Sequence, residues 1–159
     1  MATMTVRMSE EDAELIRKYA AFTGSTISDF ARSAMFEKIE DEQDLADLQA
    51  AMKADDGVRY SQDDERAGAE LTYTVEYTAR ALKQLKKMDR FDASLIVRWV
   101  ERNLQGTANP YAKGKGLTEN RTREWRYRVG DYRILCFIHD DVLTIEIFSI
   151  GHRSNIYDR

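Results

Sequence analysis

The first residues of the chain alternate between apolar and polar side chains, which is the period of a β-strand with two different faces. A strand this short leaves its edges unpaired in a single chain, so we expect it to pair with a second copy. The apolar positions are Met4, Val6 and Met8, and the polar positions are Thr3, Thr5 and Arg7.

Two stretches with helical periodicity follow. Ser9 is a typical N-cap for a helix that extends to about Thr23, and Gly24 ends it. Ser28 is expected to cap a second helix, which continues from Glu40 as an acidic extension. This extension keeps a sparse apolar line at Leu45, Leu48 and Met52.

The second half of the chain predicts an α+β domain. Its order is strand, helix, helix, strand, strand, strand, and we expect an antiparallel sheet with tight turns at Gly130-Asp131 and Asp140-Asp141. The expected elements span residues 72–77, 78–88, 92–104, 124–129, 132–139 and 142–150. Together with the polar stretch between the halves, the patterns predict a domain over residues 1–52, a linker over 53–70 and a second domain over 71–159.

Charge separates the two halves. Residues 1–70 hold 8 Lys or Arg against 17 Asp or Glu, a net charge of −9, whereas residues 71–159 hold 16 against 11, a net charge of +5. We expect the acidic segment to fold over the basic one and to cover its anion-binding face. The alternative is that each half is simply a soluble domain.

Other features bound the class of protein. The single cysteine, Cys136, lies in an apolar run and is expected to be a buried thiol, which is typical of a reducing compartment. No apolar stretch approaches 18 residues and no signal peptide is recognisable, so we expect a cytoplasmic protein without a membrane partner. We expect no cofactor and no metal site.

Basic residues gather in the last quarter. Arg126 and Arg128 alternate with Trp125 and Tyr127, so both guanidinium groups should leave the same face of a strand, where they would bind a phosphate. The interleaved aromatic side chains are expected in the core, with stacking on nucleic-acid bases as the alternative. Further basic and titratable residues are Lys113 and Lys115 in a glycine-rich loop, Arg133, and the C-terminal group of His152, Arg153 and Tyr157.

A short strand followed by two helices that meet at Gly24 resembles the ribbon-helix-helix DNA-binding fold, over residues 3–40. The resemblance implies a homodimer whose paired strands enter the major groove of an operator. It places Thr3, Thr5 and Arg7 against the bases, and the backbone amides near Thr26 and Ser28 against a phosphate.

The segments TARALKQLKKMD, GKGL, WRYRVGDYRI and IGHRSNIY, in this order over residues 72–157, resemble the RelE toxins of bacterial toxin-antitoxin pairs. Residues 3 to about 70 resemble their RelB-type antitoxins. RelE-like toxins enter the ribosomal A site and cut messenger RNA by activating a ribose 2′-hydroxyl against the adjacent phosphate. The resemblance assigns catalytic positions to Arg126, Arg128, Arg133, Arg153 and Tyr157, and it implies contacts of Lys113 and Lys115 with RNA of the message or ribosome.

The chemistry of these residue types agrees with that assignment. Fixed guanidinium groups of Arg133 and Arg153 would stabilise the charge that develops on a pentacoordinate phosphate. Arginine is a poor acid, so Tyr157 or His152 is the better proton carrier. His152 stands where relatives have lysine, and the spacing from Arg153 to Tyr157 is two residues shorter, so the sequence does not divide the proton transfer between Tyr157 and His152.

Three functions follow from the resemblance. The first is a toxin-antitoxin fusion whose ribosome-dependent endoribonuclease is inhibited by its antitoxin part, which also binds operator DNA for autoregulation. The second is a DNA-binding autorepressor with a catalytically inert toxin half. The third is a ParE-like gyrase inhibitor, because ParE toxins share the fold; they generally lack the paired tyrosine and arginine set, so this function ranks last.

Overall fold

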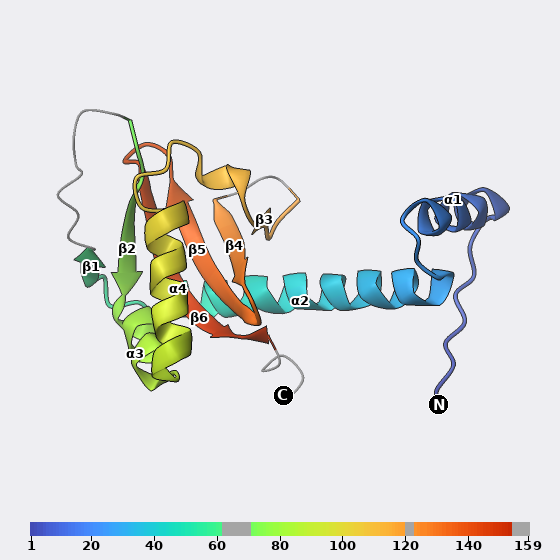
Figure 1. Ribbon diagram of the computed structural model, residues 1–159, viewed down its shortest axis with the longest axis horizontal. Coiled ribbons are helices and arrows are strands. Elements are labelled where there is room, and N and C mark those ends of the chain that lie inside the picture. Colours follow the sequence, from blue (N-terminus) through green and yellow to red (C-terminus); the bar gives the residue numbers. More distant parts are fainter. Residues whose placement is uncertain (62–70, 120–122, 154–159) are drawn as a thin grey trace. The chain divides into compact units, whose positions relative to one another are not determined.

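The computed structural model describes residues 1–61, 71–119 and 123–153, and the chain divides into two compact units, Met1–Glu40 and Asp41–Arg159. The helix α2 (Ile27–Lys53) contributes to both units, because the division falls inside it. Figure 1 shows the elements in chain order. The unit boundary therefore differs from the predicted domain boundary at residue 52, and residues 41–53 belong to the C-terminal unit.

The N-terminal unit contains α1 (Glu10–Phe22) and the first part of α2. The hydroxyl of Ser9 accepts a hydrogen bond from the amide of Asp12 at 3.1 Å, as expected for an N-cap. Residues 1–9 form no strand in the single chain. A ribbon strand exists only when a second strand pairs with it, so the predicted ribbon stays a prediction.

The second helix begins one residue before the expected cap, Ser28, which lies inside its first turn. The hydroxyl of Thr26 accepts from the amide of Asp29 at 3.1 Å and donates to its carboxylate at 2.8 Å. Thr26 is therefore the cap, because its hydroxyl accepts from the amide of the residue three positions on, as an N-cap side chain does. The expected cap at Ser28 was wrong for this reason.

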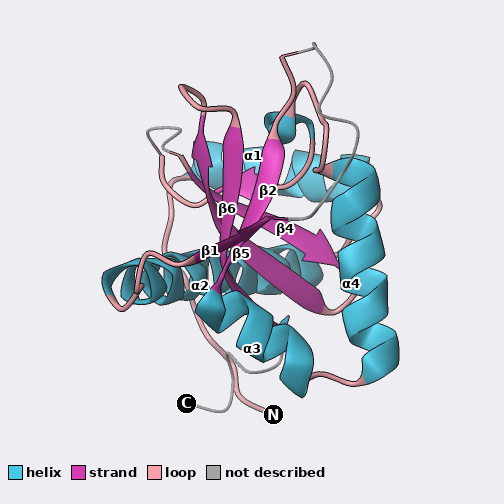
Figure 2. Cartoon of the chain, turned by 90° about the vertical axis from the view of Figure 1, so that its left-hand side faces the viewer, coloured by secondary structure: helices cyan, strands magenta, loops and turns pink. Residues whose placement is uncertain are grey.

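The C-terminal unit is a six-stranded sheet with helices on both faces (Figure 2). Its strand order is β1-β2-β6-β5-β4-β3. The strands are β1 (Arg59–Ser61), β2 (Thr74–Thr78), β3 (Lys115–Gly116), β4 (Glu124–Val129), β5 (Tyr132–His139) and β6 (Thr144–His152). The helices α3 (Ala79–Lys87) and α4 (Arg90–Asn103) follow β2, and a 3₁₀ turn η1 (Pro110–Ala112) precedes β3.

The α+β class is confirmed, and the predicted elements occur in the predicted order, with three corrections, one of which is that β3 lies in the segment predicted as a glycine-rich loop. The sheet is mixed, because β2 lies parallel to β6 while its other pairs are antiparallel. After β2, the helices α3 and α4 lead the chain to β3 and β4 on the far side of the sheet, and β5 and β6 then return by antiparallel pairing until β6 lies beside β2. This long connection allows β2 and β6 to be parallel. The third correction is that β1 lies inside the predicted linker, where it pairs with β2; residues 62–70 of that linker lie outside the described residues.

Alternation along the central strands divides the sheet into two faces. One face packs against α3 and α4 around Ile96, Ile134 and Ile147 and includes the buried thiol of Cys136, as expected. Burial raises the pKa of that thiol. The other face holds a smaller cluster of Leu48, Ala51, Leu117, Leu135 and Phe148, to which α2 contributes the first two.

Gly114 permits the close packing of the loop that precedes β3. Its φ is +77°, and a Cβ there would meet the carbonyl oxygen of Arg126 and approach Trp125 Nε1 to 2.7 Å. Gly114→Ala should therefore lower the free energy of unfolding by about 2–4 kcal/mol, from the backbone conformation and the steric overlap together. Gly57→Ala is the matched control, because Gly57 has φ +78° and no atom within 4 Å of that Cβ position. It should cost only about 1–2 kcal/mol, and equal losses in urea denaturation would refute the packing argument.

Candidate functional site

Arginine side chains gather on the face of the sheet that α2 covers. Arg128 and Arg133 are direct cross-strand partners on β4 and β5, and Arg126 lies two residues before Arg128 on the same strand. Side chains two residues apart on a strand leave the same face, so the three guanidinium groups belong to one surface. The structure thus brings together three of the arginines that the sequence singled out.

Three aspartates of α2 contact this arginine surface. Asp41 and Asp44 lie 2.7 Å and 2.9 Å from Arg126 Nη1. Asp44 also bonds Nε of Arg133, and Asp47 lies 2.5 Å from Arg133 Nη2. The acids recur at intervals of three residues, which keeps them on one side of a helix. We call Asp41, Asp44 and Asp47 the acidic triplet.

The centre of these contacts excludes water. Arg126 is 2% exposed and Asp44 is 1% exposed. Burial lowers the pKa of Arg126, but the hydrogen bonds and charges of Asp44 and Asp41 outweigh it, so that its pKa lies above the usual value of arginine. Arg126 therefore remains charged, and removal of its partners would leave a buried cation, which costs about 3–5 kcal/mol for one broken pair.

Beyond the acidic triplet, α2 packs against the same face of the sheet through apolar side chains. Leu48 is fully buried against the sheet and Ala51 is 3% exposed, in one cluster with Leu135 and Phe148. Burial of a leucine side chain contributes about 1.5–3 kcal/mol. The predicted reach of the acidic extension to the toxin-like domain is thus present within the C-terminal unit, through charged contacts at its start and apolar contacts at its end.

The structure does not place the remaining predicted catalytic residues among the contacts of the acidic triplet. His152 pairs with Tyr132, and their rings meet edge to face at 5.2 Å. Tyr132 packs toward the core under α3 and α4, which places His152 on the face opposite Arg133. The backbone amide of Arg153 donates to the carbonyl of Asp131 at 2.8 Å, beside the β4–β5 turn. Tyr157 lies outside the described residues.

The two loop lysines point to different partners. Lys115 Nζ lies 2.6 Å from Asp41, so this lysine joins the contacts of the acidic triplet. Lys113 Nζ donates to Asn103 at the end of α4 at 2.7 Å. Only Lys115, which pairs with Arg126 across β3 and β4, is therefore continuous with the arginine surface.

A cleft of about 720 Å³ opens beside β3 at the edge of the sheet. Its lining includes the aromatic rings of Tyr111 and Trp125, whose centroids are 5.0 Å apart in an edge-to-face arrangement. Asp140 accepts hydrogen bonds from Tyr111 at 2.8 Å and 2.9 Å and from Tyr73 at 2.7 Å. Burial raises the pKa of Tyr73 to about 12, and the bond to Asp140 adds to this rise. Tyr127, by contrast, is fully buried, as expected for a core aromatic residue.

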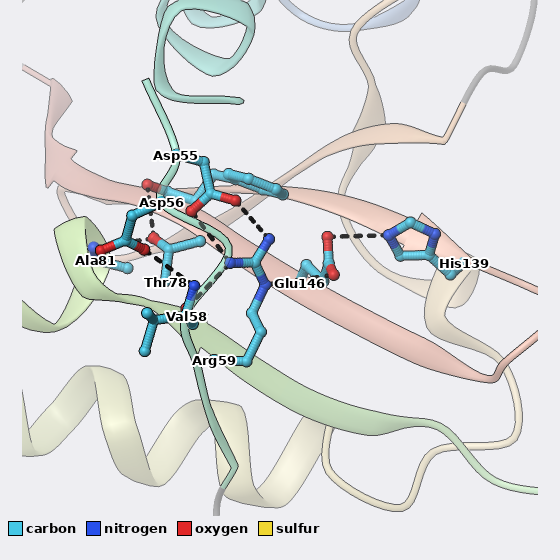
Figure 3. A network of polar contacts seen from close by, with 9 residues as sticks. Asp55, Asp56, Val58, Arg59, Thr78, Ala81, His139 and Glu146 are labelled. Atoms are coloured by element: carbon cyan, nitrogen blue, oxygen red, sulfur yellow. Dashed lines mark hydrogen bonds and ion pairs between the residues drawn. The ribbon is translucent and has the colours of Figure 1, made fainter. Parts of the chain in front are cut away.

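A second polar network secures β1 to the sheet (Figure 3). Arg59 Nη2 lies 2.7 Å from Asp55, and Arg59 Nε lies 3.3 Å from Glu146, whose other oxygen lies 2.9 Å from His139. The guanidinium also lies 5.2 Å from the ring centre of Phe148. The segment that follows α2 is thus attached to β6 by an ion pair and to β2 by strand pairing.

This network predicts a pH dependence of stability. The hydrogen bond from Arg59 lowers the pKa of Asp55 below 3.8. Because the folded pKa is depressed, its contribution is present above the unfolded value and is lost as pH falls through the folded value. The stability difference between the native chain and Asp55→Asn should therefore be constant above about pH 5 and shrink below about pH 4. Urea denaturation across this range measures it, with Asp56→Asn as control, and a difference that does not shrink would contradict the assignment.

The residues predicted to bind DNA lie in the N-terminal unit. Thr3, Thr5 and Arg7 are exposed, as are Thr26 and Ser28 at the start of α2. The Thr26 hydroxyl serves the helix cap, and the contact of this turn with a DNA phosphate stays a prediction.

Two further classes of feature are not found in the described parts of the chain. No helix there is both long and apolar enough to cross a membrane. Residues 1–61, 71–119 and 123–153 also contain no cluster of three or more His, Cys, Asp or Glu side chains arranged to hold a metal ion.

Sequence reasoning named the acidic helix but missed its specific acids. The spacing of Asp41, Asp44 and Asp47, one acid at every third position, was the available signal, because it aligns charges on one helix face. No comparable signal marked the contact of Arg59 with Glu146, which lies 87 residues away, or that of Asp140 with Tyr73, which lies 67 residues away.

Comparison with known proteins places these features in a family. Residues 75–157 match the family described as the ParE toxin of the type II toxin-antitoxin system parDE, and residues 1–67 match a family of unknown function, DUF6290. The chain is 30% identical over 89 residues to Toxin RelG of Mycobacterium tuberculosis, a match that covers 56% of this chain and 100% of that protein.

A solved structure is also similar. It is the toxin-antitoxin complex RelBE2 from Mycobacterium tuberculosis, with 28% identity, 52% of this chain and 99% of that chain covered, and a TM-score of 0.43. The predicted toxin resemblance of the C-terminal part is confirmed at the level of the superfamily by the family match and by the curated relative, whereas the ribbon-helix-helix antitoxin remains a prediction. The chain belongs to the ParE toxin family of type II toxin-antitoxin systems, within the RelE/ParE superfamily, through its residues 75–157.

Proposed function

We propose that this protein is a toxin-antitoxin fusion in which a RelE-like, ribosome-dependent mRNA endoribonuclease is held inactive by a RelB-like antitoxin part. The antitoxin part comprises residues 1–52, the connecting segment over 53–70 includes β1 of the sheet, and the toxin comprises 71–159. The observation that carries the proposal is the set of contacts between the acidic triplet and the buried pair of Arg126 and Arg133.

An arginine surface of this kind suits phosphate chemistry. Guanidinium groups bind phosphate oxygens in pairs, and groups fixed by a sheet lose little freedom when the transition state forms. Arg126, Arg128 and Arg133 would hold the scissile phosphate, with Arg153 beside them. Tyr157 or His152 would carry the proton. The position of His152 on the opposite face favours Tyr157 for this role.

The same surface explains inhibition. Carboxylates of the acidic triplet occupy the hydrogen-bonding groups that a phosphate would use, and like charge repels an incoming RNA strand. Lys115 is engaged by Asp41 as well, so one loop lysine is withdrawn together with the arginines. Release of α2 would make these groups available to the RNA of the message or ribosome, and Lys113, which contacts Asn103 of α4, would add a separate contact.

The N-terminal unit is proposed to bind operator DNA as a homodimer. It exposes apolar side chains that a second copy would cover, among them Met4, Val6 and Met8. Pairing of two such strands would present Thr3, Thr5 and Arg7 to the major groove, with the turn from Thr26 to Ser28 on the phosphate backbone.

Loss of Arg7 tests this proposal, because one good base contact is worth about 1–3 kcal/mol. Arg7→Ala should weaken binding to the protein's own promoter by about 10-fold per half-site in a gel-shift titration, while the exposed Arg17→Ala on α1 should not. Equal affinity of Arg7→Ala and the native chain would remove the assignment.

A gyrase-inhibiting activity is the second candidate, because the matched family is described as the ParE toxin. One experiment separates the two. The full chain with Asp44→Asn and Asp47→Asn, here called the released variant, is assayed for mRNA cleavage on purified ribosomes and for inhibition of DNA supercoiling by gyrase. Cleavage without gyrase inhibition supports the proposal, and the reverse result supports the second candidate. If neither activity appears in the folded variant, the autorepressor with an inert toxin half is left.

A further inference from the structure

We propose that the cleft beside β3, lined by Tyr111, Trp125, Lys115 and Gly116, binds one base of the single-stranded RNA whose phosphate lies on the arginine surface. This inference rests on the proposed ribonuclease function and adds to it a subsite for the substrate. We call it the base cleft.

The dimensions and lining suit a planar ring. A volume of about 720 Å³ lies within the range of small-molecule sites, about 300–1,000 Å³. Tyr111 is 36% exposed and Trp125 is half-buried, so both rings present area to the cleft. Proteins that bind single-stranded RNA use such rings as stacking platforms, because every base has an apolar face.

The rings are held in position before any ligand arrives. Asp140 fixes Tyr111 through its hydroxyl, and Trp125 Nε1 donates to the carbonyl of Lys113 at 2.8 Å. A Cβ on Gly116 would lie 3.2 Å from the Trp125 ring, so a side chain at this position would press on the platform. Asp140 is therefore a positioning residue, and the glycine leaves the face of the cleft open.

Strand pairing connects the base cleft to the arginine surface. Trp125 and Arg126 are consecutive on β4, so their side chains leave opposite faces of the sheet, and only the two-residue edge strand β3 lies outside them. Lys115 lies opposite Arg126 on β3 and also lines the cleft. A single-stranded RNA that passes around this edge would place its phosphates against the cations on one face and the neighbouring base against the aromatic rings on the other.

Both a cation and an anion line the cleft. Asp140 accepts hydrogen bonds from the hydroxyls of Tyr73 and Tyr111, whereas Lys115 is bound to Asp41, an anion that occupies the place expected for a phosphate. Lys115 is therefore the lining group that would bind a phosphate of the RNA. The cleft is open while α2 is bound, because the acidic triplet contacts the cations and not the rings. The intact chain should therefore accept a base weakly, and the released variant should accept it more strongly.

Photo-crosslinking of a six-nucleotide single-stranded RNA with one photoreactive base, to the full-length chain and to the released variant, tests the subsite. We expect crosslinked peptides that contain Tyr111 or Trp125, with higher yield in the released variant. Tyr111→Ala should weaken RNA binding by about 10-fold to 100-fold, the effect of one lost stacking contact. Tyr111→Phe keeps the ring and should retain binding within about 3-fold. Phe91→Ala, which removes an exposed ring on α4, is the matched control.

The outcomes separate this inference from the function on which it rests. Crosslinks that map away from the cleft, or native binding by a folded Tyr111→Ala, overturn the base cleft even if the released variant cleaves mRNA on ribosomes. Absence of ribosomal cleavage counts against the ribonuclease instead. Crosslinking at Trp125 that disappears in Tyr111→Ala and persists in Tyr111→Phe supports a stacking platform. The difference between the two variants then follows from the presence of the ring at position 111.

Discussion

Replacement of Asp44 and Asp47 by asparagine in the full-length chain should turn a harmless protein into one that arrests growth and translation. Each substitution keeps the size of the side chain and removes the charge that faces a buried or nearly buried guanidinium. Breaking one buried pair costs about 3–5 kcal/mol, which corresponds to at least about a 100-fold increase in the population with α2 released. Inducible expression followed by viable counts and labelled-amino-acid incorporation measures the effect.

The control uses the same helix. Glu42→Gln removes an equal charge from an exposed position of α2, so it should leave growth unchanged. Expression of residues 71–159 alone should arrest growth as well. A released variant that is folded by circular dichroism, soluble and harmless would take away most of the support for a toxin held in check by its acidic helix.

Within the released variant, loss of Arg133 should slow cleavage of A-site mRNA by about 10² to 10³, the cost of removing one donor to a developing anion. The guanidinium is 8% exposed and belongs to the arginine surface, so the loss would act on chemistry more than on encounter. Single-turnover cleavage on saturated ribosomes separates these steps. Arg153→Ala should show a similar loss, and ribosome binding should survive both substitutions.

The proton carrier can be identified in the same assay. Tyr157→Phe should lower the rate by about 10² to 10⁴ if its hydroxyl moves a proton. His152→Gln should leave the pH–rate profile unchanged, since His152 lies against Tyr132 on the other face. Loss of the near-neutral limb in His152→Gln would transfer the role to His152. Native rates in both Arg133→Ala and Tyr157→Phe would exclude the proposed catalytic site.

Local patterns in the sequence predicted most of the elements, because periodicity and caps act over a few residues. The helices α3 and α4 begin within two residues of the expected starts, and the expected turn at Gly130 joins β4 to β5. The turn after His139 is longer than expected, since Thr144 is the next paired residue of β6. Leu143 has φ +46°, a conformation that turn chemistry centred on Asp140 and Asp141 did not signal.

Contacts between distant segments were harder to predict. The sequence indicated that Arg126 and Arg128 share a face, but alternation alone does not say what covers that face. Burial of Arg126 depends on Asp41 and Asp44, more than 80 residues earlier. Parallel pairing of β2 with β6 likewise depends on the path of the whole domain. The face occupied by His152 required the register of β5 against β6, which its position near the C-terminus did not reveal.

Within the residues that the structure describes, the two outermost strands of the sheet are also its shortest. At one edge β1 has three residues, and at the other edge β3 has two. The inner strands β5 and β6 have eight and nine residues. Unpaired backbone groups at a border recruit strands from other molecules, and their number grows with the length of the border strand. Short borders therefore give neighbouring molecules little to extend, which protects a protein expressed at high concentration from polymerising through its sheets.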